Sequence, residues 1–330
     1  MTIMLQAGFI LVLCGSFYQL TSFYANVNQV LTARNHAERV ISFVDDKIRH
    51  AGLGLWGCET SDSIREGFNN NVYALSEQGA KAYQLPISLR EHDNVLDASI
   101  FTHMYEPPKK SDEQKNGDVL TLLYAQRNLD ENIILMTAEA QTFSGSGQKT
   151  IELLDMDSVS SLGLNGTIGD IKNYAVAEAV GIPMYLSKYV TTAEKTKKLN
   201  FTIYSSKEIV IPAASELMYV KFMQMFVRDR NDGEGPQFAF RELNGDVWDN
   251  TYNQEKGILD IYMELDKDES NGYKNPTFTL YVLASGGENQ EVTNPCPESW
   301  PGTWKDEYSH HIVYVSRASW KLNNLEGFKW

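Results

Sequence analysis

The chain has 330 residues, of which 42% are hydrophobic and 22% are charged, a composition typical of a folded globular protein and not of a disordered or fibrous one. Its 43 acidic residues outnumber its 29 basic residues, and the formal net charge of −14 argues against a nucleic-acid backbone as the main partner, because phosphates would be repelled. The three cysteines lack the tandem spacing typical of zinc, haem or iron–sulfur ligation.

The amino end carries no formal charge on its side chains, since the first Lys, Arg, Asp, Glu or His is Arg34. The stretch Thr2–Tyr24 is mainly apolar and would span roughly 35 Å as a helix, which is enough to cross a bilayer. A cleaved signal peptide and a buried core helix are the alternatives. We favour a membrane anchor, with the transmembrane half of a helix in residues 1–24, because the basic start of a signal peptide is missing.

The apolar spacing continues beyond the expected membrane segment. Apolar residues recur at steps of three and four, interrupted only by Arg34, and they are Val27, Val30, Ala37, Ile41, Val44, Ile48 and Ala51. This pattern predicts an amphipathic half of the same helix over residues 25–52, ended by Gly52 and the glycines after it. Two helices with a break near Asn26–Asn28 are the alternative.

Residues 53–330 contain short apolar runs separated by polar turns, which predicts a β-rich globular domain. The α+β fold class follows, with the long helix packed on an antiparallel β-sheet domain that carries large loops. Met218–Val227 is nearly all apolar, which favours a central strand covered on both faces. In Ile258–Leu265 we expect one face to carry Leu259, Ile261, Met263 and Leu265. The other expected strands are Asp118–Ala125, Asn132–Met136, Thr150–Leu154, Tyr174–Val180, Leu199–Tyr204, Glu208–Ile211, Thr277–Leu283 and Ile312–Ser316.

Two features deserve weighing as ligand sites. Oxygen-bearing side chains crowd around glycines at Asp229, Asn231, Asp232 and Glu234, which makes them a candidate Ca²⁺ site, although a solvated turn is the simpler interpretation. A group of late aromatic residues could bind a sugar or a protein if exposed, although core packing is the simpler explanation. These aromatic residues are Trp300, Trp304, Tyr308, Trp320 and Trp330. We find no catalytic motif of the common hydrolases or nucleotide-binding enzymes and expect no other cofactor.

The arrangement resembles the type IV pilin superfamily, and specifically the PilW-like minor pilins, which are related to the J-type pseudopilins of type II secretion. The resemblance is most specific where the long helix is expected to end, in Glu38-Arg39, Phe43–Gly52 and Gly57-Cys58. Looser matches lie at Gly117–Ala125 and Arg228–Gly233, with a weak one from Val315 to Asn323.

The resemblance implies a non-enzymatic minor pilin that assembles by its amino-terminal helix into a pilus-like filament, in a priming or tip complex. Its partners would be other minor and major pilins and, before assembly, the lipid of the bacterial inner membrane, with the domain facing the periplasm. The residues expected to serve membrane insertion and assembly are Leu5, Gln6, Phe9, Leu13 and Tyr24. The alternatives are a membrane-anchored adhesin or lectin that does not polymerise, and a membrane-tethered hydrolase.

The sequence departs from the superfamily at the fifth mature position, where pilins usually carry glutamate. A leader cleaved between Gly8 and Phe9 would place Leu13 fifth, whereas a mature start at Met1 would place Leu5 there. Neither frame supplies the carboxylate. We interpret this as a different docking mode, such as a position at the filament tip; a misassigned start or a trimmed leader is the rival explanation.

An oxidising compartment would suit the two cysteines outside the apolar segment. Cys58 follows the expected helix and Cys296 lies in a proline-rich loop, so we expect a disulfide between them, with two free thiols as the alternative. In the chain-entropy model this bond would stabilise the fold by about 4–5 kcal/mol.

Overall fold

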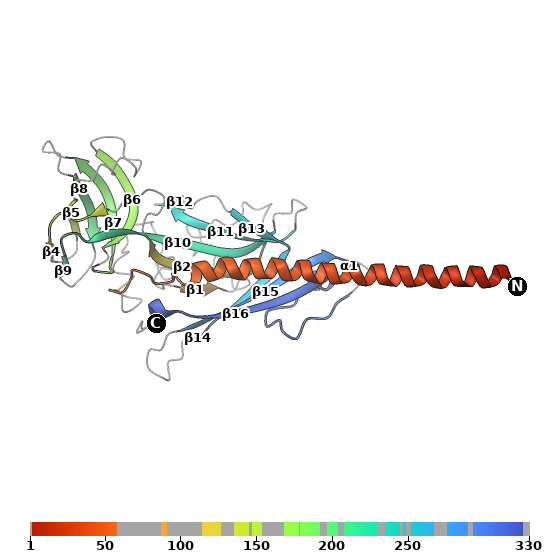
Figure 1. Cartoon of the computed structure of the whole chain (residues 1–330). Coiled ribbons are helices and arrows are strands. Elements are labelled where there is room, and N and C mark those ends of the chain that lie inside the picture. The colour runs from red at the N-terminus through yellow and green to blue at the C-terminus, as the bar shows by residue number, and fades with distance from the viewer. Residues whose placement is uncertain are drawn as a thin grey trace.

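The computed structural model describes residues 2–57, 87–90, 114–126, 135–144, 147–153, 168–177, 179–191, 197–203, 208–229, 235–244, 247–248, 252–266, 276–289 and 293–325. One long helix and antiparallel sheets make up these residues, so the α+β class is confirmed. In Figure 1 the amino end of the helix projects far from the strands, and its other end runs along them.

Helix α1 runs from Thr2 to Ile48 over 47 residues. The expected continuous helix is therefore confirmed, and the alternative break near Asn26–Asn28 is wrong. After Ile48 the chain turns through Gly52, whose φ of 74° lies in the left-handed region that favours glycine. The Gly52 N–H donates a 2.8 Å hydrogen bond to the carbonyl O of Leu123, which fastens the end of the helix to strand β2.

The larger sheet is built around β10 (Glu216–Asp229). One edge of β10 pairs with β2 and β3, and the other pairs with β6 and β11. Beyond β6 the sheet continues through β7 and β8 to β5, while β12 and β13 extend it from β11. The remaining strands of this sheet are β1 (Ile87–Arg90), β2 (Gln114–Gln126), β3 (Leu135–Met136), β5 (Gly147–Leu153), β6 (Ile168–Ala177), β7 (Pro183–Thr191), β8 (Lys197–Ile203), β11 (Gln237–Asn244), β12 (Val247–Trp248) and β13 (Tyr252–Lys256).

A second sheet has three antiparallel strands in the order β14-β15-β16. A two-stranded sheet pairs β4 with β9, and short 3₁₀ helices, η4 and η5, flank β16. These elements are β4 (Gln141–Phe143), β9 (Ile209–Ile211), β14 (Ile258–Asp266), β15 (Thr277–Glu288), η4 (Asp306–His310), β16 (His311–Lys321) and η5 (Asn323–Leu325).

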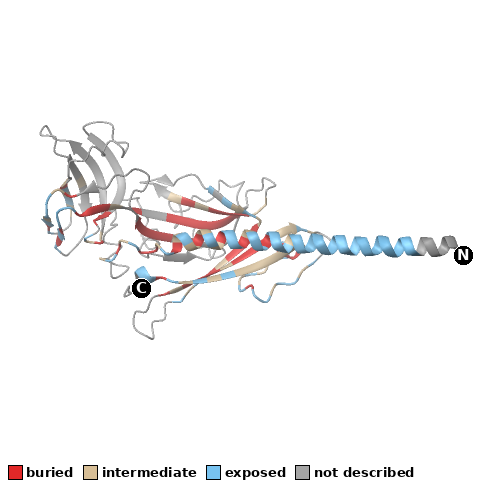
Figure 2. Ribbon diagram, viewed as in Figure 1, coloured by how far each residue is buried: buried red, intermediate tan, exposed pale blue. Residues whose placement is uncertain are grey.

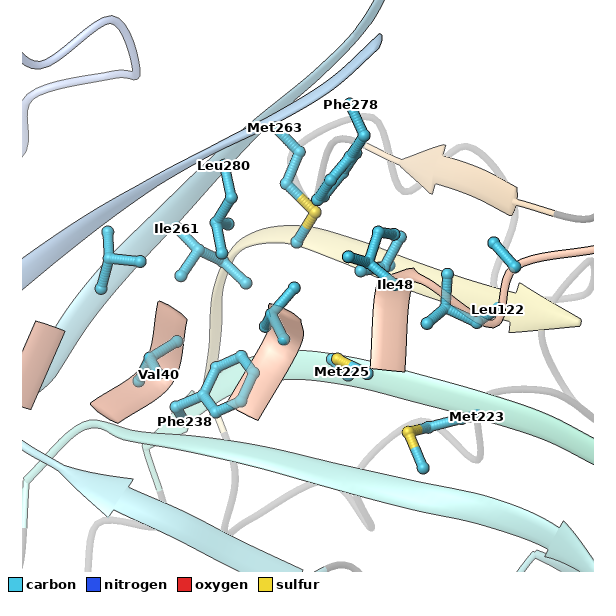
Figure 3. Close-up of a cluster of buried hydrophobic side chains, with 14 of the residues drawn as sticks. Val40, Ile48, Leu122, Met223, Met225, Phe238, Ile261, Met263, Phe278 and Leu280 are labelled. Carbon is cyan, nitrogen blue, oxygen red and sulfur yellow. The ribbon is translucent and has the colours of Figure 1, made fainter. Parts of the chain in front are cut away.

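The carboxyl half of α1 packs against strands of both sheets (Figures 1 and 3). One buried cluster joins Val40 and Ile48 of the helix to Met225 and Phe238 of the larger sheet and to Phe278 of the smaller one. The helix face in this cluster consists of Ala33, Ala37, Val40, Val44 and Ile48, continued by Ala51 after the helix ends. The helix thereby supplies apolar surface that the two sheets would otherwise lack.

The predicted apolar stripe of the helix is correct in part. Ala37, Val44, Ile48 and Ala51 are buried as expected, but Val27 and Val30 are exposed because they lie before Ala33, where burial of the helix begins. The stripe followed steps that average about 3.5 residues, whereas a straight helix turns every 3.6 residues. The face that meets the sheets is consequently rotated toward Ala33 and Val40, which the stripe left out.

The predicted face of β14 is wrong at Leu259. A β-bulge between Ile258 and Asp260 places an extra residue in the strand, so Leu259 and Ile261 lie in different buried clusters. Leu259 joins Trp300 and Tyr308 on the sheet face turned away from the helix. The bulge therefore lets β14 serve two cores.

Candidate functional site

The most distinctive surface of the molecule is the protruding segment, which we define as residues 9–32 of α1. Its side chains are exposed except for the half-buried Gln29, and the first fully buried residue is Ala33 (Figure 2). Its large apolar side chains are exposed by between 37% and 77%: Phe9, Ile10, Leu11, Val12, Leu13, Phe17, Tyr18, Leu20, Phe23, Tyr24, Val27, Val30 and Leu31. The helix as described from Phe9 onward is long and apolar enough to cross a membrane.

Two hydroxyl groups in the middle of the protruding segment have hydrogen-bond acceptors within the helix itself. Ser16 Oγ donates to the Val12 carbonyl at 2.9 Å, and Thr21 Oγ1 donates to the Phe17 carbonyl at 2.8 Å. Such bonds to the preceding turn leave no unsatisfied hydroxyl hydrogen to be desolvated. With no formally charged side chain before Arg34, the segment suits a medium without water.

We call the part of the molecule that contains the sheets the body. The helix leaves the body at a close contact of Gln29 with Gly286 and Gly287 of β15, which we call the neck. A Cβ added to Gly286 would lie 1.7 Å from the carbonyl oxygen of Gln29, so only glycine permits this approach of two backbones. A Cβ added to Gly287 would meet the Gln29 side-chain Nε2 at 2.9 Å. The register of β15 against β16 also shifts between Ser285 and Glu288. The expected strand stopped at Leu283, and the Gly-Gly pair is the only sequence signal for this contact.

Polar contacts hold the packed half of α1 to the sheets beside the neck. His36 Nδ1 forms a short contact with Glu255 Oε1 of β13, and Arg39 Nη1 lies 3.4 Å from the same oxygen. The Glu255 side chain is only 10% exposed, so little water competes for its carboxylate. These contacts fix the helix against β13, which the sequence did not identify as a strand.

A second polar contact lies one helix turn before the end of α1. Asp45 Oδ1 accepts hydrogen bonds from Arg49 Nη2 at 2.6 Å and from the indole nitrogen of Trp320 in β16. The bond from Arg49, followed by that from Trp320, lowers the pKa of Asp45 below its usual range. The carboxylate thus connects the helix to the smaller sheet in its charged form.

The residues predicted for assembly all lie in α1. Phe9, Leu13 and Tyr24 are exposed by 66%, 41% and 59%, whereas Leu5 and Gln6 belong to the turns whose side chains are not described. The candidate cleavage point between Gly8 and Phe9 falls inside the helix.

The candidate Ca²⁺ residues fall at the edge of the described chain. Asp229 is the last residue of β10, and Asn231, Asp232 and Glu234 lie outside the described residues. Across the ranges that the structure describes, no three His, Cys, Asp or Glu side chains are grouped so that they could hold a metal ion. The Ca²⁺ site stays a prediction.

The two described cysteines, Cys14 and Cys296, are free and exposed. Cys58 lies outside the described residues, so the expected disulfide stays a prediction. Of the late aromatic residues, Trp300 and Tyr308 are buried in the cluster around Leu259, where Trp304 packs against them. Trp320 stacks on Phe278 with ring centroids 5.7 Å apart, and Trp330 is not among the described residues. Core packing therefore accounts for Trp300, Tyr308 and Trp320.

Comparison with known protein families, curated proteins and solved structures found no match to this chain.

Proposed function

We propose that this chain is a membrane-anchored, non-enzymatic minor pilin or pseudopilin of the PilW-like kind, which assembles by α1 into a type IV pilus-like filament. The observation that carries the proposal is the division of one continuous helix into two halves. The protruding segment is apolar, exposed and free of formal charge, and the following half is packed on antiparallel sheets.

The protruding segment would serve in two environments. In the bilayer most of its apolar side chains face lipid, and the hydroxyls of Ser16 and Thr21 are bonded within the helix. In a filament the same side chains would pack against the helices of other pilins. Because lipid tails and leucine side chains are similarly apolar, the transfer depends on helix–helix packing to offset the loss of lipid contacts.

The packed half would transmit force from the helix to the body. The buried cluster around Val40 and Ile48 and the contacts at Glu255 and Asp45 attach the helix to three separate strands, β13, β15 and β16. Lifting the helix out of the membrane would therefore carry the body with it. In this proposal the body faces the periplasm of a bacterium and contacts other minor pilins in a priming or tip complex.

The proposal is tested by expressing the tagged full chain in a pilus-bearing host and isolating sheared filaments. We expect the chain to be found in the filament fraction, and Phe17→Lys to remove it, because a charge at the centre of a membrane helix costs about 2.5–3.5 kcal/mol. Ser42→Lys is the matched control, since Ser42 is exposed on the packed half of α1.

A chain that requires detergent for extraction but never enters filaments would contradict the proposal. That result would favour a membrane-anchored surface binding protein that does not polymerise. A saturable catalytic activity that is lost on substitution of a single carboxylate would contradict the non-enzymatic part.

A further inference from the structure

The apolar side chains of the protruding segment include a regular stripe along one side of the helix. Its members recur at alternating steps of three and four residues, and we call this stripe the seam: Ile10, Leu13, Phe17, Leu20, Tyr24, Val27 and Leu31. All are exposed, by between 37% and 67%. The spacing averages about 3.5 residues, which is the period of helices that wind around one another.

The seam lies on the side of α1 that points away from the body. At about 100° per residue, Phe17 and Tyr24 fall roughly opposite the buried residues Ala33 and Ala37. The side of the protruding segment in line with those buried residues is more polar and carries Gln19 and Asn26. Among the described residues, the seam is therefore exposed while the opposite side of the helix, further along α1, packs on the sheets.

The part of α1 that precedes the buried residues is longer than the hydrocarbon core of a bilayer is thick. Residues 2–32 span about 46 Å at about 1.5 Å per residue, whereas the hydrocarbon core is about 30 Å thick. An average tilt of about 20° changes this comparison by only a few ångströms. If the amino end reaches the far side of the hydrocarbon, Tyr24, Val27 and Leu31 lie between the lipid tails and the body. At that depth apolar side chains are driven to find a partner.

We propose that the seam is the contact face for the same segment of a second copy of this chain, with the two helices parallel. The seam carries no charge, so it can meet itself across a two-fold axis without repulsion. Its seven exposed apolar side chains would form the centre of that interface, which matches the apolar character of homodimer interfaces. This inference rests on the membrane insertion in the proposed function but not on filament assembly.

Cysteine cross-linking of the full chain in native membranes tests the proposal. In a Cys14→Ser background, Leu20→Cys and Val27→Cys place a thiol on the seam, and the adjacent Gln19→Cys and Asn26→Cys place one on the polar side at nearly the same depth. We expect an oxidant to form disulfide-linked homodimers several-fold faster at the two seam positions. The Cys14→Ser chain without an added cysteine measures how much homodimer forms through Cys58 and Cys296 alone.

Three outcomes would overturn the proposal. They are equal cross-linking on both sides of the helix, faster cross-linking at Gln19→Cys and Asn26→Cys, and no homodimer above the level in the Cys14→Ser background. A seam disulfide to a different protein, identified by mass spectrometry, would overturn the choice of partner. A chain that enters filaments without seam homodimers refutes the seam and leaves the proposed function standing. Seam homodimers in a chain that is never found in filaments would support the seam and refute the proposed function.

Discussion

The close contact at the neck makes Gly286→Ala the most informative single substitution. The added Cβ would lie 1.7 Å from the carbonyl oxygen of Gln29, where ordinary contacts begin at 3.4 Å, so the two backbones must separate by about 1.7 Å. Gln29 lies inside α1 and Gly286 inside β15, so a movement of either backbone would disturb a regular element. Overpacking typically costs about 1–3 kcal/mol, and we expect the upper end. This corresponds to a fall in Tm of roughly 5 °C or more.

Thermal unfolding of the detergent-solubilised full chain, followed by tryptophan fluorescence, measures the effect. Gln29→Ala is the matched control, because it shortens the side chain but keeps the carbonyl that the Cβ would meet. We expect this control to change Tm little and to leave the loss in Gly286→Ala unrelieved when the two are combined. An unchanged Tm for Gly286→Ala, or its rescue by Gln29→Ala, would refute the reasoning from backbone contact.

Three further substitutions probe the core and its polar contacts. Ile48→Ala should lower the free energy of unfolding in urea by about 2–5 kcal/mol, because removal of the buried side chain leaves a cavity between the two sheets. A loss below about 1 kcal/mol, as at an exposed site, would count against this packing. Tyr308→Phe removes the hydroxyl that donates to Asp260 Oδ2 at 3.0 Å and should cost about 1–3 kcal/mol in the same assay, since a buried carboxylate loses a donor. Asp45 has a pKa lowered by Arg49, so its contribution is present above the unfolded pKa of about 4 and is lost as the pH falls through the folded value. Asp45→Asn should therefore reduce the fall in the urea midpoint of unfolding between pH 6 and pH 3. An unchanged fall would show that the charged Asp45 contact does not stabilise the fold.

Most of the strong apolar runs formed the strands expected of them, but strands with mixed composition were missed. The expected strands at Asp118–Ala125 and Met218–Val227 lie inside β2 and β10. Strand β11, in contrast, contains the buried polar residues Gln237 and Arg241, and Arg241 donates to Gln224 of β10 at 3.0 Å. A buried polar residue in a strand depends on a partner from another strand, and local sequence does not reveal that partner.

The candidate site likewise has one part that the sequence predicted and one part that it did not. Its protruding segment follows from the absence of charge before Arg34, and this property needs no partner in order to be recognised. The neck does not follow from sequence, because Gly286 and Gln29 are distant in the chain and the need for glycine arises only where their backbones meet.

The sequence by itself determined that a long apolar helix begins the chain, because helix formation and apolar periodicity are set by residues three and four positions apart. Tertiary structure alone decided which helix face is buried and which strands receive it. It also decided, through the bulge at Leu259, that one strand contributes to two cores. These features depend on the twist and register of strands far apart in sequence, where a shift of one residue exchanges the two faces of a strand.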